Sequence, residues 1–183
     1  REEVILGNFE EGEVIREAPL VKRFQTSRGP VRDALLQLSQ EGLLEYIPNC
    51  GMKVSKVWDE KLIPLMAVTR FELESFALTQ LIGKSSSGFI KKLQKNLRQF
   101  KLACQDGMIS DVIKLDLEFH RMLLQECDQV AVESVWLPLL GGLRLPYSRH
   151  ENLIESYLEH KAIVDAIESR DLEAATAALK KNI

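Results

Sequence analysis

Residues 20–51 read LVKRFQTSRGPVRDALLQLSQEGLLEYIPNCG, and this stretch decides the fold of the first part of the chain. It contains a short helix, a tight turn, a second helix with arginines near its start, and two short strands around a glycine-containing turn. This order is typical of a winged helix-turn-helix, in which one helix enters the DNA major groove and a hairpin lies beside it. The stretch therefore predicts a double-stranded DNA partner.

Local signals mark the boundaries of the two helices. Pro19 fits the first turn of a helix that begins near Glu17, because its missing N–H needs no partner there. Ser27 is a favourable N-cap for the second helix, and Gly42 can adopt the left-handed conformation that ends it. The residues expected to face inward from the second helix are Val31, Ala34, Leu35 and Leu38.

A hairpin is expected directly after the second helix. Leu43–Pro48 and Met52–Val57 have the composition of strands, and Asn49-Cys50-Gly51 between them can form a turn with a positive φ angle at glycine. Residues 1–57 are therefore expected to form one small winged helix-turn-helix domain.

Basic charge is concentrated in the same part of the chain. Between Lys22 and Arg32 every charged residue is basic, although the whole chain carries a formal net charge of −3 at pH 7. A sequence-specific regulator needs only a local basic patch of this kind. Arg28 and Arg32 are four residues apart, so both side chains point away from the apolar side of their helix.

Beyond Trp58 the pattern changes to long amphipathic stretches without strand signals. Their apolar faces require the helices to pack against one another in an antiparallel bundle. Residues 58–183 are therefore expected to form an all-helical domain, and the fold class is mainly α. The six expected helices span residues 60–82, 87–105, 109–127, 130–145, 148–169 and 171–182, with a break at Pro146.

The composition indicates a globular protein of cytoplasmic type. Of the 183 residues, 45% are hydrophobic and 28% are charged, which is the ordinary balance for a soluble domain. No apolar run reaches the length of a membrane span, and the acidic start differs from a signal peptide, so no membrane partner is expected. Cys50, Cys104 and Cys127 are scattered without metal-binding spacing, which favours free thiols in a reducing compartment.

Several motifs resemble the GntR family of bacterial transcriptional regulators. SRGPVRDAL (27–35), EGL (41–43) and PNCG (48–51) are similar to the family signature S-R-x-P-V-R-E-A-L…E-G-L…P-N-x-G. Downstream, RFELE (70–74), DLEFH (116–120) and EHKAI (159–163) resemble the all-helical FCD effector domain of the FadR- and VanR-like branch. The resemblance implies a homodimer that binds a palindromic operator and releases it when a small metabolite enters the helical domain.

Two sets of residues are expected at the DNA. An arginine at a helix N-terminus can offer paired donors to guanine or bind a phosphate strongly, while lysines elsewhere raise affinity without selecting sequence. The simpler alternative is an ordinary solvated arginine face. By resemblance the groove contacts are Ser27, Arg28, Gly29, Arg32 and, at the wing tip, Gly51, with Lys22 and Lys53 as phosphate contacts.

A second candidate site lies in the helical part. Asp116 and His120 are four residues apart on a strongly apolar helix, so both side chains leave the same face and can hold one cation. By resemblance, the FCD metal site adds His160 and a position twenty-two residues later, which here is Asn182 rather than histidine. The implied cofactor is a divalent ion such as Zn, Ni or Mn, and an amide oxygen favours Mn or Ni over a tightly held Zn. Alternatives are a core hydrogen bond between Asp116 and His120, and an empty site in which Asn182 bonds an effector or water.

Arg70, which begins the RFELE motif, has two interpretations. It can form an ion pair with Glu74 one helical turn away, or it can clamp the carboxylate of an effector. Arg144 and Arg149 are weaker candidates for the same pocket. The complete set of expected effector contacts is Arg70, Asp116, His120, His160 and Asn182.

The leading hypothesis is a DNA-binding repressor whose operator affinity is controlled by a small, carboxylate-bearing metabolite in the helical domain. One alternative is a metal-sensing regulator in which the ion itself is the signal. Another is a metal-dependent enzyme built on Asp116, His120 and His160. The enzyme is disfavoured, because no additional general base or nucleophile occurs in a matching constellation.

Overall fold

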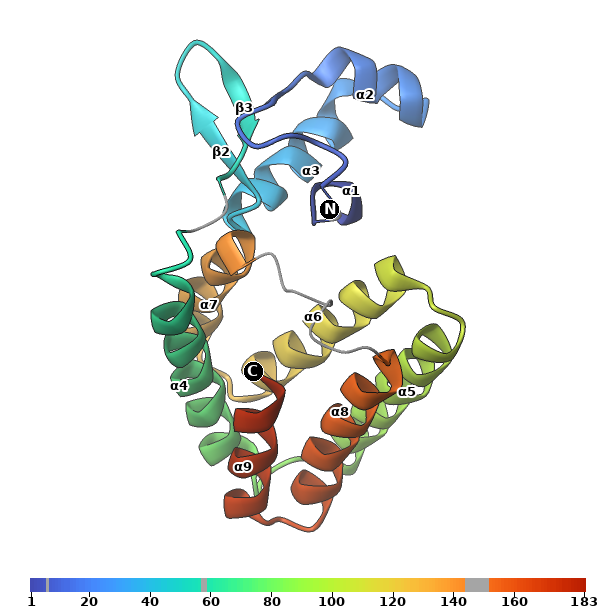
Figure 1. Cartoon of the computed structure of the whole chain (residues 1–183), viewed down its shortest axis with the longest axis vertical. Helices are drawn as coiled ribbons and strands as arrows, with labels where there is room; N and C mark the ends of the chain where they lie inside the picture. The colour runs from blue at the N-terminus through green and yellow to red at the C-terminus, as the bar shows by residue number, and fades with distance from the viewer. Residues whose placement is uncertain (6, 57–58, 144–151) are drawn as a thin grey trace. The chain divides into compact units, whose positions relative to one another are not determined.

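The computed structural model of the chain describes residues 1–5, 7–56, 59–143 and 152–183 (Figure 1). These residues divide into two compact units. The first unit contains Arg1–Ile63 and the part of a later helix that begins at Ser134. The second contains Pro64–Glu133 and the two C-terminal helices.

The N-terminal unit is a winged helix-turn-helix, as the sequence predicts. In chain order its elements are α1 (Glu2–Ile5), β1 (Val14–Ile15), α2 (Glu17–Phe24), α3 (Arg28–Gln40), β2 (Leu44–Ile47) and β3 (Gly51–Val54). The strands form one antiparallel sheet in the order β1-β3-β2. A compact apolar core lies beneath the helices and strands, and it includes Val31 and Leu35 from α3 and Leu44 and Val54 from the sheet.

The wing differs from the expected two-stranded ribbon in two respects. A third strand, β1, pairs with β3 through Val14 opposite Lys53 and Ile15 opposite Met52. A strand of two residues is too short to show an alternating pattern, so the sequence alone did not reveal it. The hairpin is also shorter than expected, because β2 ends at Ile47, before Pro48, whose nitrogen cannot donate to a sheet.

The two helices begin and end close to their expected positions, with two local corrections. Ser27 occupies the N-cap position of α3, but its side chain makes no capping hydrogen bond. Ala34 is exposed rather than inward-facing, while Val31 and Leu35 are buried as expected. Gly42 has a φ angle of 72°, which is the left-handed conformation predicted for the end of the helix.

The second part of the chain is helical throughout its described residues. The helices are α4 (Ile63–Leu81), α5 (Ser87–Gln105), α6 (Ile109–Glu126), α7 (Val130–Leu143), α8 (Leu153–Glu168) and α9 (Leu172–Asn182). They correspond to the six expected helices, so the predicted fold class is confirmed. The expected break at Pro146 lies outside the described residues.

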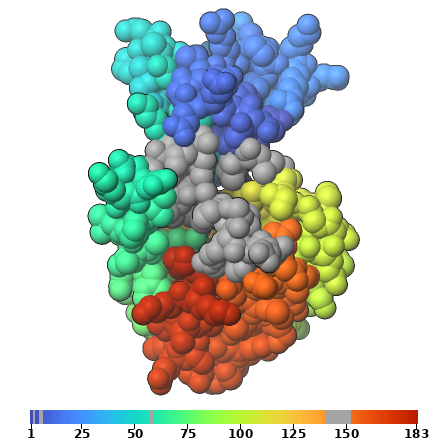
Figure 2. Space-filling model, in the orientation of Figure 1, coloured from blue at the N-terminus to red at the C-terminus, as the bar shows by residue number. Residues whose placement is uncertain are grey.

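The core of the bundle is built by α4, α5, α6, α8 and α9. Buried side chains from each of these helices form one cluster, which includes Leu78, Leu93, Phe119, Ile163 and Leu179. On the surface, α8 and α9 adjoin in orange and red, with the yellow-green α5–α6 region beside them (Figure 2). Within the part of the chain that is described, no helix combines the length and apolar character needed to cross a membrane.

Candidate DNA-binding face and metal centre

The N-terminus of α3 presents the side chains that the sequence predicts at the DNA. Ser27, Arg28, Gly29 and Arg32 are all exposed, whereas Val31 in the same turn is buried. Pro30 occupies the first turn of the helix, where its missing N–H costs no hydrogen bond. The segment therefore offers two guanidinium groups at an exposed helix N-terminus.

Arg32 is held by an ion pair that the sequence did not indicate. Its Nε donates to Glu17 Oε1 at 2.7 Å, which links the start of α2 to the first turns of α3. The hydrogen bond with Glu17 raises the pKa of Arg32, so the guanidinium remains charged at every relevant pH. Because both side chains are largely solvent-exposed, the pair contributes little to stability but restricts the direction of the guanidinium.

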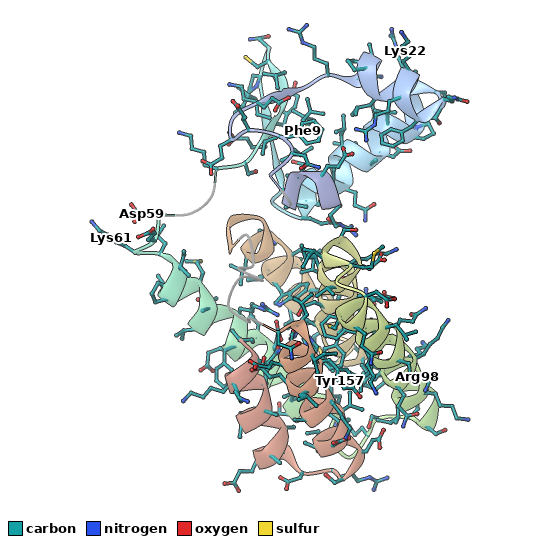
Figure 3. All side chains as sticks on the ribbon, turned by 45° about the vertical axis from the view of Figure 1, so that its right-hand side comes forward. Phe9, Lys22, Asp59, Lys61, Arg98 and Tyr157 are labelled. Atoms are coloured by element: carbon teal, nitrogen blue, oxygen red, sulfur yellow. The ribbon has the colours of Figure 1, made fainter. Side chains whose placement is uncertain are left out.

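The wing and α2 supply the remaining expected contacts. Gly51 has a φ angle of 92°, and a Cβ atom there would meet nothing within 4 Å, so its backbone conformation rather than lack of space requires glycine. Lys53 lies on β3 and is half-buried. Lys22 projects from α2 into solvent (Figure 3). Three separate elements of the N-terminal unit therefore carry the predicted contact residues.

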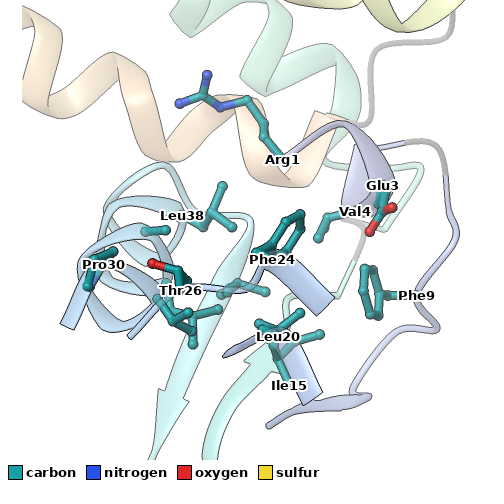
Figure 4. Close-up of a pocket in the computed structure, with 14 residues that line it drawn as sticks. Arg1, Glu3, Val4, Phe9, Ile15, Leu20, Phe24, Thr26, Pro30 and Leu38 are labelled. Atoms are coloured by element: carbon teal, nitrogen blue, oxygen red, sulfur yellow. The ribbon is translucent and has the colours of Figure 1, made fainter. Parts of the chain in front are cut away.

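An apolar pocket of about 300 Å³ also lies in this unit (Figure 4). Its lining includes Phe9, Leu20, Phe24 and Leu38. None of its lining residues belongs to the effector site predicted from the sequence. Arg1, Glu3 and Thr26 are the polar residues of its lining, and the others are apolar.

In the helical bundle, three buried side chains from two helices converge. Asp116 and His120 lie on α6 and His160 on α8, and their ligand atoms are all within 4.8 Å of one another. Asp116 Oδ1 is 3.1 Å from Nε2 of His160 and 3.9 Å from Nε2 of His120. Ligand atoms around one cation at about 2.1 Å are roughly 3–4 Å apart, so small side-chain movements would let all three side chains bind one ion.

Hydrogen bonds on the far side of each imidazole orient both rings. His160 Nδ1 is 2.8 Å from the carbonyl oxygen of Ser156, and His120 Nδ1 is 2.6 Å from Glu74 Oε2. Both neighbours are acceptors, so each Nδ1 carries a proton, and in the neutral form of each ring Nε2 keeps its lone pair. These two Nε2 atoms are buried and have no hydrogen-bond partner.

The charges around the cluster favour an ionised Asp116 and a neutral His120. Burial alone would raise the pKa of Asp116, but the neighbouring His160 and His120 outweigh it and hold that pKa far below its ordinary value. Burial lowers the pKa of His120, against the opposing influence of Glu74. A negative oxygen therefore faces two nitrogen lone pairs, an arrangement that a positive charge between them would stabilise.

Glu74 is a member of this site that sequence reasoning did not assign. It is fully buried on α4, where its Oε1 accepts from Arg70 Nε at 2.7 Å and its Oε2 faces His120. Burial would raise the pKa of Glu74, but Arg70 and His120 outweigh that effect and lower it to about 2. The ion-pair interpretation of Arg70 is thus realised in the structure, and the pair touches the cluster directly.

Aromatic rings close the cluster on other sides. The ring centroid of His160 is 4.6 Å from that of Phe100 on α5 and 4.8 Å from that of Phe119 on α6. Cys104 on α5 is also near, and burial, followed by the charge of Asp116, raises the pKa of its thiol to about 11. Cys104 is therefore not a thiolate at neutral pH.

Asn182, the expected fourth ligand, lies beside His160 at the end of α9. Its Nδ2 is 3.4 Å from Nδ1 of His160, the ring nitrogen that does not face Asp116. The bundle thus brings Arg70, Asp116, His120, His160 and Asn182 into one neighbourhood. Arg144 and Arg149 lie outside the described residues.

A helix-turn-helix with a wing, followed by a helical bundle, is an architecture of DNA-binding transcription regulators. Sequence comparison identifies the family. Residues 1–54 match the profile described as bacterial regulatory proteins, gntR family, and residues 66–183 match the FCD domain. The chain belongs to the GntR family and carries an FCD domain, and it is a transcription regulator rather than an enzyme.

Relatives and solved structures agree with this assignment. The transcriptional repressor RspR of Escherichia coli is 25% identical over 181 residues, covering 94% of this chain and 77% of that protein. The gluconate operon transcriptional repressor of Bacillus subtilis is 24% identical over 192 residues, covering 100% of this chain and 78% of that protein. The fold is similar to that of E. coli McbR/YncC, with a TM-score of 0.76 at 20% identity over 99% of this chain and 88% of that one.

Proposed function

We propose that this regulator is a repressor whose operator affinity is set by a small carboxylate-bearing metabolite bound at a metal centre in its FCD domain. The observation that carries the proposal is the convergence of two buried imidazole Nε2 atoms on the Asp116 carboxylate, whose Oδ1 lies 3.1 Å from His160 and 3.9 Å from His120. Two imidazole nitrogens and one carboxylate oxygen this close together can bind one cation.

The donor set fits a divalent ion. Asp116, His120 and His160 would hold it, with Asn182 as a proposed fourth contact, and two imidazoles with one carboxylate suit Zn, Ni or Mn. An ion held by these side chains would act as a Lewis acid that attracts the carboxylate of a metabolite. Arg70 is the proposed second anchor for that carboxylate, since a guanidinium can bind two carboxylates at once.

At the DNA, we assign Arg28 and Arg32 to base or phosphate contacts from the start of α3, with Ser27 and Gly29 close to the backbone. Lys22 and Lys53 are the proposed phosphate contacts and Gly51 the contact at the wing tip. The proposal further includes a homodimer on a two-fold symmetric operator, and domain limits of 1–57 and 58–183. Exposure of the α3 N-terminus supports the assignment.

The switch requires that the metabolite binds more tightly to the arrangement of the two DNA-binding units that fits the operator poorly. Any effector that binds both arrangements equally leaves the operator affinity unchanged. A metal-sensing regulator is the second candidate, because the same two Nε2 atoms would respond to the ion without an organic ligand.

A titration distinguishes the two candidates. The operator is first selected from random DNA, and its affinity for the full chain is measured by fluorescence anisotropy with Ni²⁺, Mn²⁺ or Zn²⁺ and with a panel of short hydroxy and keto acids. We expect an acid to weaken binding only when the metal is present. A change with metal alone would favour the metal sensor, and no change under any condition would refute both.

A further inference from the structure

Glu74 connects two helices at the centre of the FCD domain. It lies on α4, and His120, 46 residues later, lies on α6. Both side chains are fully buried, so no water competes for the 2.6 Å contact between Glu74 Oε2 and His120 Nδ1. In such surroundings a hydrogen bond from an imidazole to a carboxylate is strong and directional.

The contact decides which nitrogen of His120 carries the proton. An ionised carboxylate can only accept, so the imidazole must donate from Nδ1, and its lone pair must then lie on Nε2. Nε2 is the nitrogen that faces Asp116 at 3.9 Å. With the opposite tautomer, His120 would present an N–H to the centre and could not bind a cation there.

Arg70 orients the Glu74 carboxylate so that it can accept the hydrogen bond from His120. Its Nε donates to Oε1 at 2.7 Å, which leaves Oε2 directed at His120. Arg70 and Glu74 are one turn apart on the same helix, so the orientation of the carboxylate is fixed by α4 itself. A protonated or rotated Glu74 would lose this orientation.

We infer that Glu74 is a positioning residue for the metal centre: it holds His120 in the Nδ1–H tautomer and directs its Nε2 at the cation, and Arg70 orients Glu74. This inference rests on the proposed metal centre for its consequence, but the tautomer itself is a property of the metal-free protein. Carboxylates that orient a ligating histidine commonly change metal affinity 10- to 100-fold when removed.

The same contact ties α4 to the occupancy of the centre. The Nδ1–H of His120 would become a stronger donor to Glu74 if Nε2 held a cation. By linkage, a stronger attachment of α4 through Glu74 would then also favour ion binding. One hydrogen bond would thereby couple α4 to the metal centre.

The tautomer can be measured without any metal. Long-range proton–nitrogen NMR correlations on the full chain identify the protonated nitrogen of each of its three histidines, and a His120→Gln sample assigns the signals. In the wild type we expect His120 to be protonated only on Nδ1. In Glu74→Gln we expect a second population protonated on Nε2, and a Kd for Ni²⁺ about 10- to 100-fold weaker by isothermal titration calorimetry.

Two further variants exclude a general loss of structure. Glu72→Gln removes an exposed carboxylate from the same helix and should change neither the tautomer of His120 nor the Kd for Ni²⁺. The double variant Arg70→Gln with Glu74→Gln removes both charges of the buried ion pair together rather than leaving one of them unpaired, so it should fold and still show the mixed tautomer. A single Nδ1–H tautomer and an unchanged Kd in Glu74→Gln would overturn the inference. Absence of Ni²⁺ binding to the wild type would refute the metal centre alone, while the tautomer in Glu74→Gln would still decide the role of Glu74.

Discussion

Nε2 of His160 lies 3.1 Å from Oδ1 of Asp116, and in the neutral ring, whose Nδ1–H donates to the carbonyl oxygen of Ser156, neither of these two atoms carries a proton. Two acceptors at this distance repel each other unless a positive charge lies between or beside them. The relationship joins α6 to α8 across the bundle. It is the contact that the proposed cation would relieve.

Replacing Asp116 by Asn should abolish stabilisation by metal. The amide keeps the size of the side chain but removes the negative charge that attracts the ion. For the wild type, Ni²⁺ at a hundredfold excess over its Kd should add about 2.7 kcal/mol to the free energy of unfolding, and Asp116→Asn should show no such gain. Thermal unfolding with and without Ni²⁺ measures the difference. Glu118→Gln, an exposed change on the same helix, serves as the control and should respond like the wild type.

The buried charges predict that stability falls in acid. The folded-state pKa of His120 is below its ordinary 6.5, and that of Glu74 is about 2 against an ordinary 4.5. Both groups bind protons more readily in the unfolded chain, so unfolding takes up protons as the pH falls. The contribution of His120 is fully present above pH 6.5 and is lost as the pH falls below it. That of Glu74 is present above pH 4.5 and is lost between there and about pH 2.

Denaturant unfolding of metal-free protein at a series of pH values tests this assignment. The wild type should lose stability progressively below pH 6.5, and Glu74→Gln should have a shallower slope below pH 4.5. Glu72→Gln removes an exposed carboxylate and should retain the wild-type slope. Equal slopes for all three proteins below pH 4.5 would contradict the charged state assigned to Glu74.

The helices and the DNA-binding motif could be predicted from the sequence because their signals are local. Pro19 and Gly42 mark helix ends, and the spacing of the apolar residues of α3 indicates a helix, so each signal depends only on residues within one or two turns. Asp116 and His120 are also local, since four residues place them on one face of α6. Residues that a single helix brings together could therefore be predicted from their spacing in the sequence.

Contacts between segments that are distant in the sequence could not be predicted from such local patterns. Glu74 resembles an ordinary helical ion-pair partner of Arg70, and nothing in the sequence shows that its second oxygen reaches His120, 46 residues away. The ion pair between Glu17 and Arg32 crosses the turn between two helices in the same manner. Such pairings depend on how the helices pack, which no periodic pattern encodes.

Substitutions in α2 and α3 should separate sequence recognition from general affinity. Arg28→Ala should cost about 1–3 kcal/mol of operator binding and relax the base preference at one position of each half-site, because it removes a directed guanidinium. Lys22→Ala should weaken binding to all DNA sequences alike and reduce the steepness of log K against log salt concentration by about 1. Anisotropy titrations at several salt concentrations measure both effects. Lys180→Ala, an exposed change on α9, should have neither effect.

Breaking the ion pair between Arg32 and Glu17 should strengthen DNA binding. In the free protein Glu17 holds the Arg32 guanidinium at 2.7 Å, and a phosphate must compete with this carboxylate. Glu17→Gln removes the competing charge and one source of repulsion toward the DNA backbone, so operator affinity should rise, most clearly at low salt. Glu10→Gln removes an exposed carboxylate elsewhere in the same unit and should have a smaller effect. Weaker binding by Glu17→Gln would mean instead that the pair presents Arg32 in the orientation that DNA requires.

A histidine at position 182 should complete the metal centre. Asn182 Nδ2 lies 3.4 Å from Nδ1 of His160, the ring nitrogen that does not face Asp116, so the longer imidazole side chain has to reach past this ring to the ion. Imidazole is a stronger ligand than an amide oxygen for Ni²⁺ and Zn²⁺. We therefore expect Asn182→His to lower the Kd for each ion by about tenfold or more, which corresponds to about 1.4 kcal/mol of binding free energy. Lys180→His places an imidazole on the same helix but in solvent and should leave the Kd unchanged. Equal Kd values for the two variants and the wild type in calorimetry would exclude residue 182 from the coordination of the ion.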